Sequence, residues 1–290
     1  MKRFVLFLFL LGASACLFAT SMEVVLLGTG YPRPDADRAG PATAVIVGDK
    51  VFLVDAGRGV MMRYASLGLP LKSIRAVFLT HLHSDHISGL PDVFTSTWIF
   101  GRENPLELYG PEGVAAMGDG LLKFFAADII IRRDLVEADP PEGAKINIHV
   151  VQEGVVYQDA DVKITAFAVD HGPVKPAFGY LFECGGRRIV ISGDTRPSDN
   201  LVKYARGADV LIHEVYAPGF FEEHNPPQRA QRLKAYHTSA DEVGEIAQRA
   251  GVKLLVLSHI VGAESEKVIR ERVAAHFKGP FILGRDLMRF

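Results

Sequence analysis

The segment of residues 80–86, THLHSDH, places three histidines and one aspartate within six positions, directly after an apolar run that is typical of a β-strand. Because side chains alternate in an extended segment, His81 and His83 point to the same side. Asp85 and His86 diverge and suit a second metal better than the first. The alternative is a polar turn with incidental histidines. So many nitrogen and oxygen ligands in one short loop instead predict a site for divalent metals, two rather than one.

Four further segments place a candidate ligand directly after an apolar strand. The candidates are Asp55, His171, Asp194 and His259. Each of them alone could be an ordinary hydrogen-bonded surface residue. Their recurrence at strand ends is the arrangement by which a rigid scaffold positions a site, so we expect them to lie together.

The elements that would carry these residues alternate along the chain. Apolar runs predict strands at residues 23–28, 43–47, 51–54, 76–80, 146–151, 162–169, 188–192, 209–212 and 253–257. Periodic stretches predict helices at residues 60–67, 113–125, 200–205, 227–235, 239–250 and 265–277. Two runs of strands interleaved with helices indicate a layered α/β fold. We predict one domain with two similar halves, because the candidate ligands come from both.

The N-terminus has the pattern of a secretory signal peptide: a basic start, an apolar run and then small residues. We therefore expect a leader at residues 1–20, a single hydrolase domain at residues 21–290, and export to the periplasm or beyond. An uncleaved anchor and lipidation at Cys16 are the alternatives, and no stable membrane span is expected. Cys16 and Cys184 are the two cysteines of the chain, so loss of Cys16 with the leader would exclude an intrachain disulfide. The net charge of −2 is not that of a general nucleic-acid binder, although a local basic patch stays open.

These motifs resemble the metallo-β-lactamase fold, and within it the branch of the ribonuclease Z and arylsulfatase-type hydrolases. The matching segments follow the family's order along nearly the whole chain: residues 26–30, 80–86, 171–172, 177–180, 192–196, 211–214, 236–239 and 258–260. The resemblance implies an α/β fold, a four-layer αβ/βα sandwich with the site at one edge of two packed sheets. Members are often dimers, which leaves a homodimer open.

The resemblance also implies which side chains hold the metals: His81, His83 and His171 the first, Asp85, His86 and His259 the second, and Asp194 both. Imidazole ligands favour zinc, so we expect two Zn²⁺, with other divalent metals as alternatives. Two metals about 3.5–4 Å apart can hold an attacking and a leaving oxygen. The family's di-iron members carry Glu where His83 stands, and its β-lactamases carry Cys where Asp194 stands. The chain departs from both.

A second group is expected beside the metals. His237 and Glu214 resemble the ribonuclease's proton-relay pair, and an imidazole oriented by a carboxylate can protonate a leaving alkoxide. With Asp85 they form the expected catalytic set, while Asp55 would orient a metal ligand. Glu214 could instead be a buried structural carboxylate, and we interpret His213 as structural.

Two aromatic or basic segments could bound the substrate. Trp98, Phe100 and the loop at residues 220–227 would either form a pocket wall or belong to the core and its connections. Arg33 or Arg38 could pair with an anionic sulfate or phosphate oxygen, unless both are solvated.

Transfer of the ribonuclease's activity meets two objections. The long basic arm that grips tRNA in one common form has no room in residues 181–191, and export would separate the enzyme from tRNA. The leading hypothesis is therefore an exported dinuclear zinc hydrolase that cleaves small anionic sulfate or phosphate esters through hydroxide activated by the metals. A ribonuclease Z-like phosphodiesterase of the 3′-tRNA processing type is the alternative. A non-catalytic metal-bound scaffold is a third hypothesis.

Overall fold

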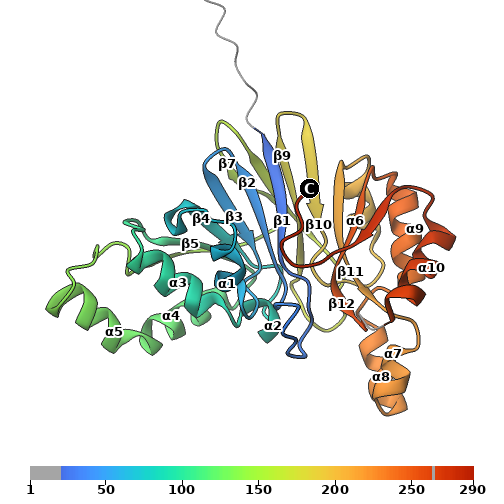
Figure 1. Cartoon of the computed structure of the whole chain (residues 1–290), viewed down its shortest axis with the longest axis horizontal. Helices are drawn as coiled ribbons and strands as arrows, with labels where there is room; N and C mark the ends of the chain where they lie inside the picture. The colour runs from blue at the N-terminus through green and yellow to red at the C-terminus, as the bar shows by residue number, and fades with distance from the viewer. Residues whose placement is uncertain (1–20, 263–264) are drawn as a thin grey trace, which may run out of the picture.

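The computed structural model describes residues 21–262 and 265–290 and contains two β-sheets packed face to face (Figure 1). The N-terminal sheet consists, in spatial order, of β1 (Met22–Gly28), β2 (Ala42–Val47), β3 (Lys50–Val54), β4 (Ile74–Phe78), β5 (Leu106–Gly110) and β6 (Ile146–Val150). The C-terminal sheet consists of β13 (Phe281–Leu283), β12 (Leu255–Val261), β11 (Val210–Tyr216), β10 (Arg187–Ile191), β9 (Phe178–Cys184), β8 (Lys163–Ala168) and β7 (Gly154–Gln158).

Both sheets combine an antiparallel part with a parallel part. Strands β1, β2 and β3 pair antiparallel, and β3 to β6 pair parallel. In the C-terminal sheet β7 to β10 pair antiparallel, and β10 to β13 pair parallel. The two halves predicted from the sequence therefore share one plan. In each half the parallel strands end at the same edge, where loops can converge on one site.

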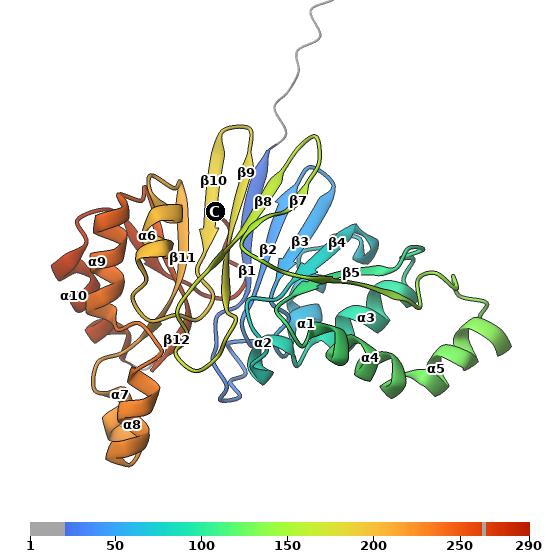
Figure 2. The same cartoon turned by 180° about the vertical axis from the view of Figure 1, so that it is seen from behind.

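Helices cover the outer face of each sheet (Figures 1 and 2). Those of the N-terminal half are α1 (Val60–Ala65), the 3₁₀ turn η1 (Leu71–Ser73), α2 (Ser84–Ile87), α3 (Leu90–Ile99), α4 (Val114–Phe124), α5 (Ala126–Ile130) and the π-helical turn η2 (Ile131–Leu135). Those of the C-terminal half are α6 (Asp199–Ala205), α7 (Phe220–His224), α8 (Pro227–Lys234), α9 (Ala240–Ala250) and α10 (Glu266–His276). The structure thus confirms the four-layer αβ/βα sandwich.

The alternation of side chains in the strands explains the three cores. In β1, Val24 and Leu26 face the opposite sheet, and Val25 and Leu27 face the helices. Both faces are buried, so the strand is apolar throughout rather than alternating. A third core lies between the C-terminal sheet and α6, α9 and α10. The two sheets are therefore fixed against each other by apolar packing, which gives the site at their edge a rigid support.

The predicted elements correspond to observed ones, with several omissions. All nine predicted strands and all six predicted helices lie on observed elements, although the boundaries shift by a few residues. The sequence analysis missed four strands, β5, β7, β9 and β13, and four helices, α2, α3, α5 and α7. Helix α3 is rich in threonine and aromatic residues, which have modest helix propensity, and packing of its buried Phe94 and Trp98 stabilises it instead.

The C-terminal residues return to the first strand. Backbone hydrogen bonds join Val24 to Phe290 and Leu26 to Met288. Asp286 accepts hydrogen bonds from the backbone NH of Thr29 and from the Arg63 guanidinium. This segment, residues 284–290, links the end of the C-terminal half to the N-terminal sheet.

Residues 1–20, for which a leader or anchor is expected, lie outside the described residues, and the division into leader and single domain stays a prediction. Within the described ranges no helix is long and apolar enough to cross a membrane.

Candidate metal centre

The loop between β4 and α2 is fixed by one buried carboxylate. Asp55, at the end of β3, accepts hydrogen bonds from the backbone NH of Thr80 at 2.8 Å and from its hydroxyl at 2.9 Å. It also lies 2.7 Å from His86 Nδ1. Asp55 adopts the left-handed backbone conformation, with φ of 60°, which a non-glycine residue rarely takes without a functional reason. The prediction that Asp55 orients a ligand agrees with this geometry.

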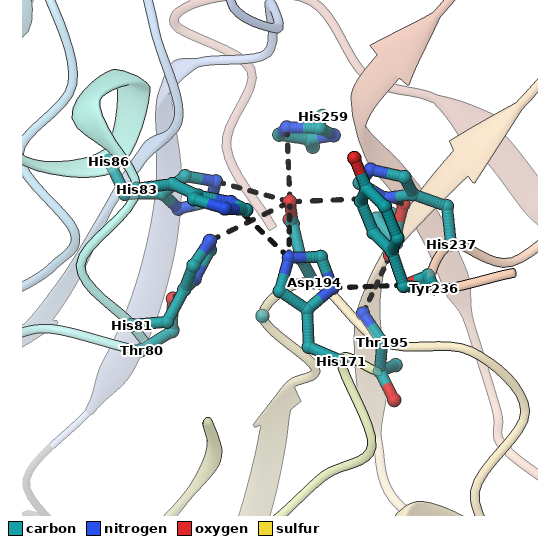
Figure 3. Close-up of polar contacts among 12 residues, drawn as sticks. Thr80, His81, His83, His86, His171, Asp194, Thr195, Tyr236, His237 and His259 are labelled. Carbon is teal, nitrogen blue, oxygen red and sulfur yellow. Dashed lines mark hydrogen bonds and ion pairs between the residues drawn. The ribbon is translucent and has the colours of Figure 1, made fainter. Parts of the chain in front are cut away.

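The seven predicted ligands converge at the edge of the two sheets. Figure 3 labels His81, His83, His86, His171, Asp194 and His259 among them. Donor atoms of His81, His83, His171 and Asp194 lie within 4.8 Å of one another, and so do those of Asp85, His86 and His259. Asp194 lies between the two groups. Its Oδ2 is 3.4 Å from both His86 Nε2 and His259 Nε2 and 3.9 Å from His81 Nε2. One carboxylate therefore reaches both sets, as a bridging ligand must.

The hydrogen bonds around the histidines show that the residues fit divalent cations. His81 Nδ1 lies 3.0 Å from the Thr80 hydroxyl, which donates to Asp55, so the nitrogen carries the proton. His86 Nδ1 faces the Asp55 carboxylate, and His171 Nδ1 lies 2.9 Å from the Tyr236 carbonyl oxygen. In the neutral form of each ring, Nε2 then carries a lone pair directed at the cluster. Buried Nε2 atoms of His81 and His86 have no hydrogen-bond partner among the described residues, which is the state a metal ligand requires.

The electrostatics of the cluster also suit a cation. Burial and the neighbouring His86 hold the pKa of His81 well below its usual value, and burial lowers the pKa of His171 to about 4. Burial raises the pKa of Asp194, but His259 and His86 outweigh this and lower it. His86 is different: burial lowers its pKa, yet Asp194 and Asp55 raise it above the usual value. A cation at His86 would therefore release a proton.

His259 owes its direction to a local irregularity of β12. The strand pairs Ser258 with Glu214 and Ile260 with Val215, so His259 is an extra residue in a β-bulge. Its φ of 43° is also in the left-handed region. A bulge turns the side chain away from the regular alternation. This places His259 Nε2 3.3 Å from Asp85 Oδ2, inside the second set.

His237 and Glu214 form the buried pair that the sequence predicted. His237 Nδ1 lies 2.7 Å from Glu214 Oε2, and the other carboxylate oxygen accepts the backbone NH of Thr195 at 2.6 Å. Burial and the nearby Asp194 raise the pKa of Glu214, while burial lowers the pKa of His237. Burial thus disfavours the charged form of both groups.

A pocket of about 360 Å³ opens onto this cluster. Metal-centre residues form its floor, and its walls come from the following residues: Tyr31, Pro32, Phe220, Phe221, Asn225, Arg229, Leu233, Tyr236 and Val261. The loop at residues 220–227 thus forms a wall, as α7 and the start of α8. Sequence reasoning missed Arg229 and Tyr236, although Tyr236 directly precedes a predicted catalytic histidine.

The other predicted boundary residues lie elsewhere. Trp98 is fully buried in the core beneath α3, and Phe100 is exposed. Arg38 donates hydrogen bonds to the Thr29 hydroxyl and to the Gly284 carbonyl oxygen, so it holds the loop rather than facing the pocket. Arg33 lines a separate hollow in its own loop.

The sequence is similar to known proteins along most of its length. The family described as beta-lactamase superfamily domain matches residues 50–260. Ribonuclease Z of Mycobacterium marinum is 41% identical over 277 residues, which cover 92% of this chain and 98% of the relative. The chain belongs to the ribonuclease Z family. Ribonuclease Z of Mycobacterium tuberculosis, at 38% identity and 97% coverage of the relative, agrees with this membership.

Solved structures independently support the metallo-β-lactamase fold. A metallo-β-lactamase fold protein of Bacillus subtilis, YhfI, superposes with a TM-score of 0.73 at 22% identity and covers 93% of this chain and 99% of its own. Human tRNase Z, short form, gives a TM-score of 0.69 at 23% identity and covers 92% and 98%. At these identities the likeness shows the fold alone. Family and donor cluster together make the protein a metal-dependent hydrolase.

The leading hypothesis of an exported sulfate or phosphate ester hydrolase is wrong. The curated relatives near 40% identity carry the name ribonuclease Z, which supports the alternative hypothesis. The error has a physical cause, because sulfate and phosphate esters use the same metal chemistry and the same ligands. The lack of room for a tRNA-gripping arm in residues 181–191 does not exclude a ribonuclease Z. The M. marinum relative is matched over 98% of its length, so that ribonuclease Z also lacks a long insertion. Location itself stays a prediction.

Proposed function

We propose that this protein is a zinc-dependent endoribonuclease that hydrolyses a phosphodiester bond of tRNA precursors, in the manner of a ribonuclease Z. The observation that best supports the proposal is a single cluster of His and Asp side chains suited to metals, which lies beside the Glu214–His237 pair. The chain that carries it aligns with ribonuclease Z over 92% of its length. Zinc is the proposed metal because most of the ligands are imidazoles.

The proposed roles of the ligands follow from their positions. His81, His83 and His171 would hold one zinc ion, and Asp85, His86 and His259 the other. Asp194 would contact both. When bound, two such ions polarise a phosphoryl oxygen and lower the pKa of water.

The protein's own residues supply the proton. His237 borders the pocket, and its Nδ1 is held by Glu214. In its protonated form, His237 would carry a second proton on Nε2 and pass it to the oxygen leaving the phosphorus, while its Nδ1 NH stays hydrogen-bonded to Glu214. Thr195 fixes the carboxylate through its backbone NH, so the imidazole keeps one orientation.

The pocket walls suit a nucleotide beside the cleaved bond. Tyr31, Phe220 and Tyr236 offer aromatic surface on which bases can stack. Arg229 adds a positive charge that can pair with a phosphate oxygen. The pocket admits only a short piece of RNA, so the body of a tRNA would lie outside it.

The test is cleavage of a labelled tRNA precursor with a 3′ trailer by the purified zinc-loaded protein. We expect one cut near the trailer junction, suppressed by a chelator and restored by zinc. Bis-p-nitrophenyl phosphate serves as a general phosphodiester control and p-nitrophenyl sulfate as the sulfatase control. Turnover of the small phosphodiester without any cut in the precursor would overturn the RNA assignment.

A further inference from the structure

Tyr236 is held by several contacts close to its backbone. Its carbonyl oxygen accepts a hydrogen bond from His171 Nδ1 at 2.9 Å. Its ring meets the His171 ring edge to face, with centroids 5.0 Å apart, and its centroid lies 4.6 Å from that of the His237 ring (Figure 3). The residue therefore lies between a proposed metal ligand and the proposed proton donor, in contact with both.

A glycine on the facing loop makes room for this side chain. A Cβ atom at Gly172 would lie only 2.8 Å from the Cβ of Tyr236, which is closer than side chains pack. Gly172 also has a φ of 59°, in the left-handed region that favours glycine. Because Gly172 directly follows His171, the loop that carries this histidine packs tightly against Tyr236. The inner end of the Tyr236 side chain is therefore fixed, and its phenol end is the part that projects.

The hydroxyl at the projecting end lies in the pocket above the metal-ligand cluster. Tyr236 lines that pocket together with Asp85, Asp194 and Arg229. Burial and the nearby Asp194 raise the pKa of Tyr236, Arg229 lowers it, and Asp85 adds a further increase. Since these charges act on the phenolic oxygen, this oxygen lies near the same three residues that form the floor and one wall. The hydroxyl also keeps its proton at neutral pH, so it can donate a hydrogen bond.

This hydroxyl has no hydrogen-bond partner in the part of the chain that the structure describes. Two other tyrosines differ, because the Tyr64 and Tyr180 hydroxyls donate to the carbonyl oxygens of Pro70 and Leu79. Tyr236 is partly buried rather than sealed, and it borders open space. It therefore offers an O–H donor to the molecule that occupies the pocket.

We propose that the Tyr236 hydroxyl donates a hydrogen bond to a non-bridging oxygen of the phosphate that is cleaved, as a further catalytic residue beside the Glu214–His237 pair. Negative charge on such an oxygen grows in the transition state, so the hydrogen bond is stronger there than in the bound substrate. Because the side chain is already fixed against Gly172 and His171, little reorganisation is needed. Tyr236 keeps its proton throughout. The proposal rests on the proposed phosphodiester hydrolysis and not on RNA as the substrate.

The variant Tyr236→Phe tests this role, because it removes the donor and keeps the carbonyl oxygen and the ring. On bis-p-nitrophenyl phosphate we expect kcat to fall about 10²-fold with KM nearly unchanged, as for loss of one donor to a transition-state oxygen. The zinc content should not change. Tyr204→Phe is the matched control, since it removes a hydroxyl that bonds Glu153 on the surface, and it should keep kcat. Unchanged kcat in Tyr236→Phe, a rise in KM alone, or loss of zinc would overturn the proposal.

A sulfur-substituted substrate separates direct contact from a general change of the site. Sulfur accepts hydrogen bonds weakly, so a phosphorothioate diester has already lost most of the bond when its sulfur faces Tyr236. The rate deficit of Tyr236→Phe should then be smaller for one phosphorothioate diastereomer than for the other diastereomer or the oxygen substrate. Equal deficits for all three substrates would place the hydroxyl away from the phosphate and refute the inference.

A crystal structure of the unaltered zinc-loaded protein with inorganic phosphate tests the contact without turnover. We expect the Tyr236 hydroxyl oxygen within about 2.5–3.0 Å of a phosphate oxygen. A hydroxyl directed to any other partner would contradict the proposal. If the tRNA precursor stays uncut while Tyr236→Phe shows its deficit on the small diester, the RNA assignment fails and the role of Tyr236 stands. Precursor cleavage at equal rates by both proteins would overturn the role of Tyr236 alone.

Discussion

The two sheets contribute to the metal centre in different ways. The N-terminal sheet presents four of the proposed ligands on the continuous segment 81–86. His81 and His83 precede helix α2, Asp85 and His86 lie in it, and Asp55 fixes the segment. The C-terminal sheet delivers His171, Asp194 and His259 from three separate strand ends or bulges, and also the Glu214–His237 pair. The first contribution is local, whereas the second requires distant strands to be in register. The C-terminal sheet therefore carries both Asp194, which lies near the two proposed ligand sets, and the proposed proton-relay pair.

The largest effect is expected at the connecting residue. Asp194→Ala removes the only proposed ligand that reaches both sets and leaves buried imidazoles without their anion. We expect RNA cleavage to fall to background and at least one zinc ion to be lost, measured by rates and by elemental analysis. The matched control is Asp170→Ala, a nearby carboxylate paired with Arg196. If Asp194→Ala kept full activity and both metals, Asp194 would not connect the two ligand sets, and the proposed role of the C-terminal sheet would be wrong.

The next largest effect is expected at His237, where cleavage should fall while zinc binding is retained. His237→Ala should lower the cleavage rate by about 10²–10⁴-fold, the usual contribution of a general acid. Both zinc ions should stay bound, because His237 is not among the proposed ligands. Glu214→Gln should give a smaller loss, since the glutamine can still hold the ring. Loss of zinc from His237→Ala would instead make it a ligand.

The local contribution of the N-terminal sheet is tested at Asp55. Asp55→Asn removes the charge that orients His86 and holds Thr80, so we expect zinc affinity to fall by about 10–100-fold. Asp92→Asn, an exposed carboxylate on α3, should leave zinc affinity unchanged. Equal affinities for the two variants would show that the loop keeps its shape without Asp55.

The smallest effect, on the stability of the fold, is expected at a salt bridge between the two sheets. Lys50, on β3, lies 2.7 Å from both Asp159 and Asp161, in the turn between β7 and β8. Lys50→Met should lower the free energy of unfolding by about 0.5–1 kcal/mol at neutral pH, measured by urea denaturation. Lys253→Met should change it less, since Lys253 is 70% exposed and pairs within its own half.

The contribution of this salt bridge to the free energy of unfolding should depend on pH in a definite direction. Burial raises the pKa of Asp159, but hydrogen bonds from Lys50 and from backbone NH groups outweigh burial and lower it. A carboxyl whose folded pKa is lowered stabilises the fold above its unfolded pKa of about 3.9. The difference between Lys50→Met and the unaltered protein should therefore shrink as the pH falls below about 4. If the difference in unfolding free energy stayed constant with pH, Asp159 would not contribute to the stabilisation.

The same comparison explains what the sequence could reveal. The loop at residues 80–86 is visible because its ligands are neighbours in the chain. His171, Asp194 and His259 could be placed because they follow apolar strands, and the parallel strands end at one edge. The Tyr236 carbonyl that fixes His171, and the bulge that turns His259, depend on backbone geometry set by tertiary packing. The substrate was misjudged because the ligands are shared by several ester hydrolases.

The return of residues 284–290 to β1 has a further consequence. Strand β1 is the outermost strand of the N-terminal sheet, and its exposed flank would otherwise present unpaired amide and carbonyl groups. Such a flank is a template on which a second chain can add a strand. Hydrogen bonds that Leu26 donates to Met288 and that Val24 exchanges with Phe290 occupy it. The closing segment thus guards the protein against edge-to-edge aggregation, and a chain shortened before Arg285 should lose solubility before it loses its metal ligands.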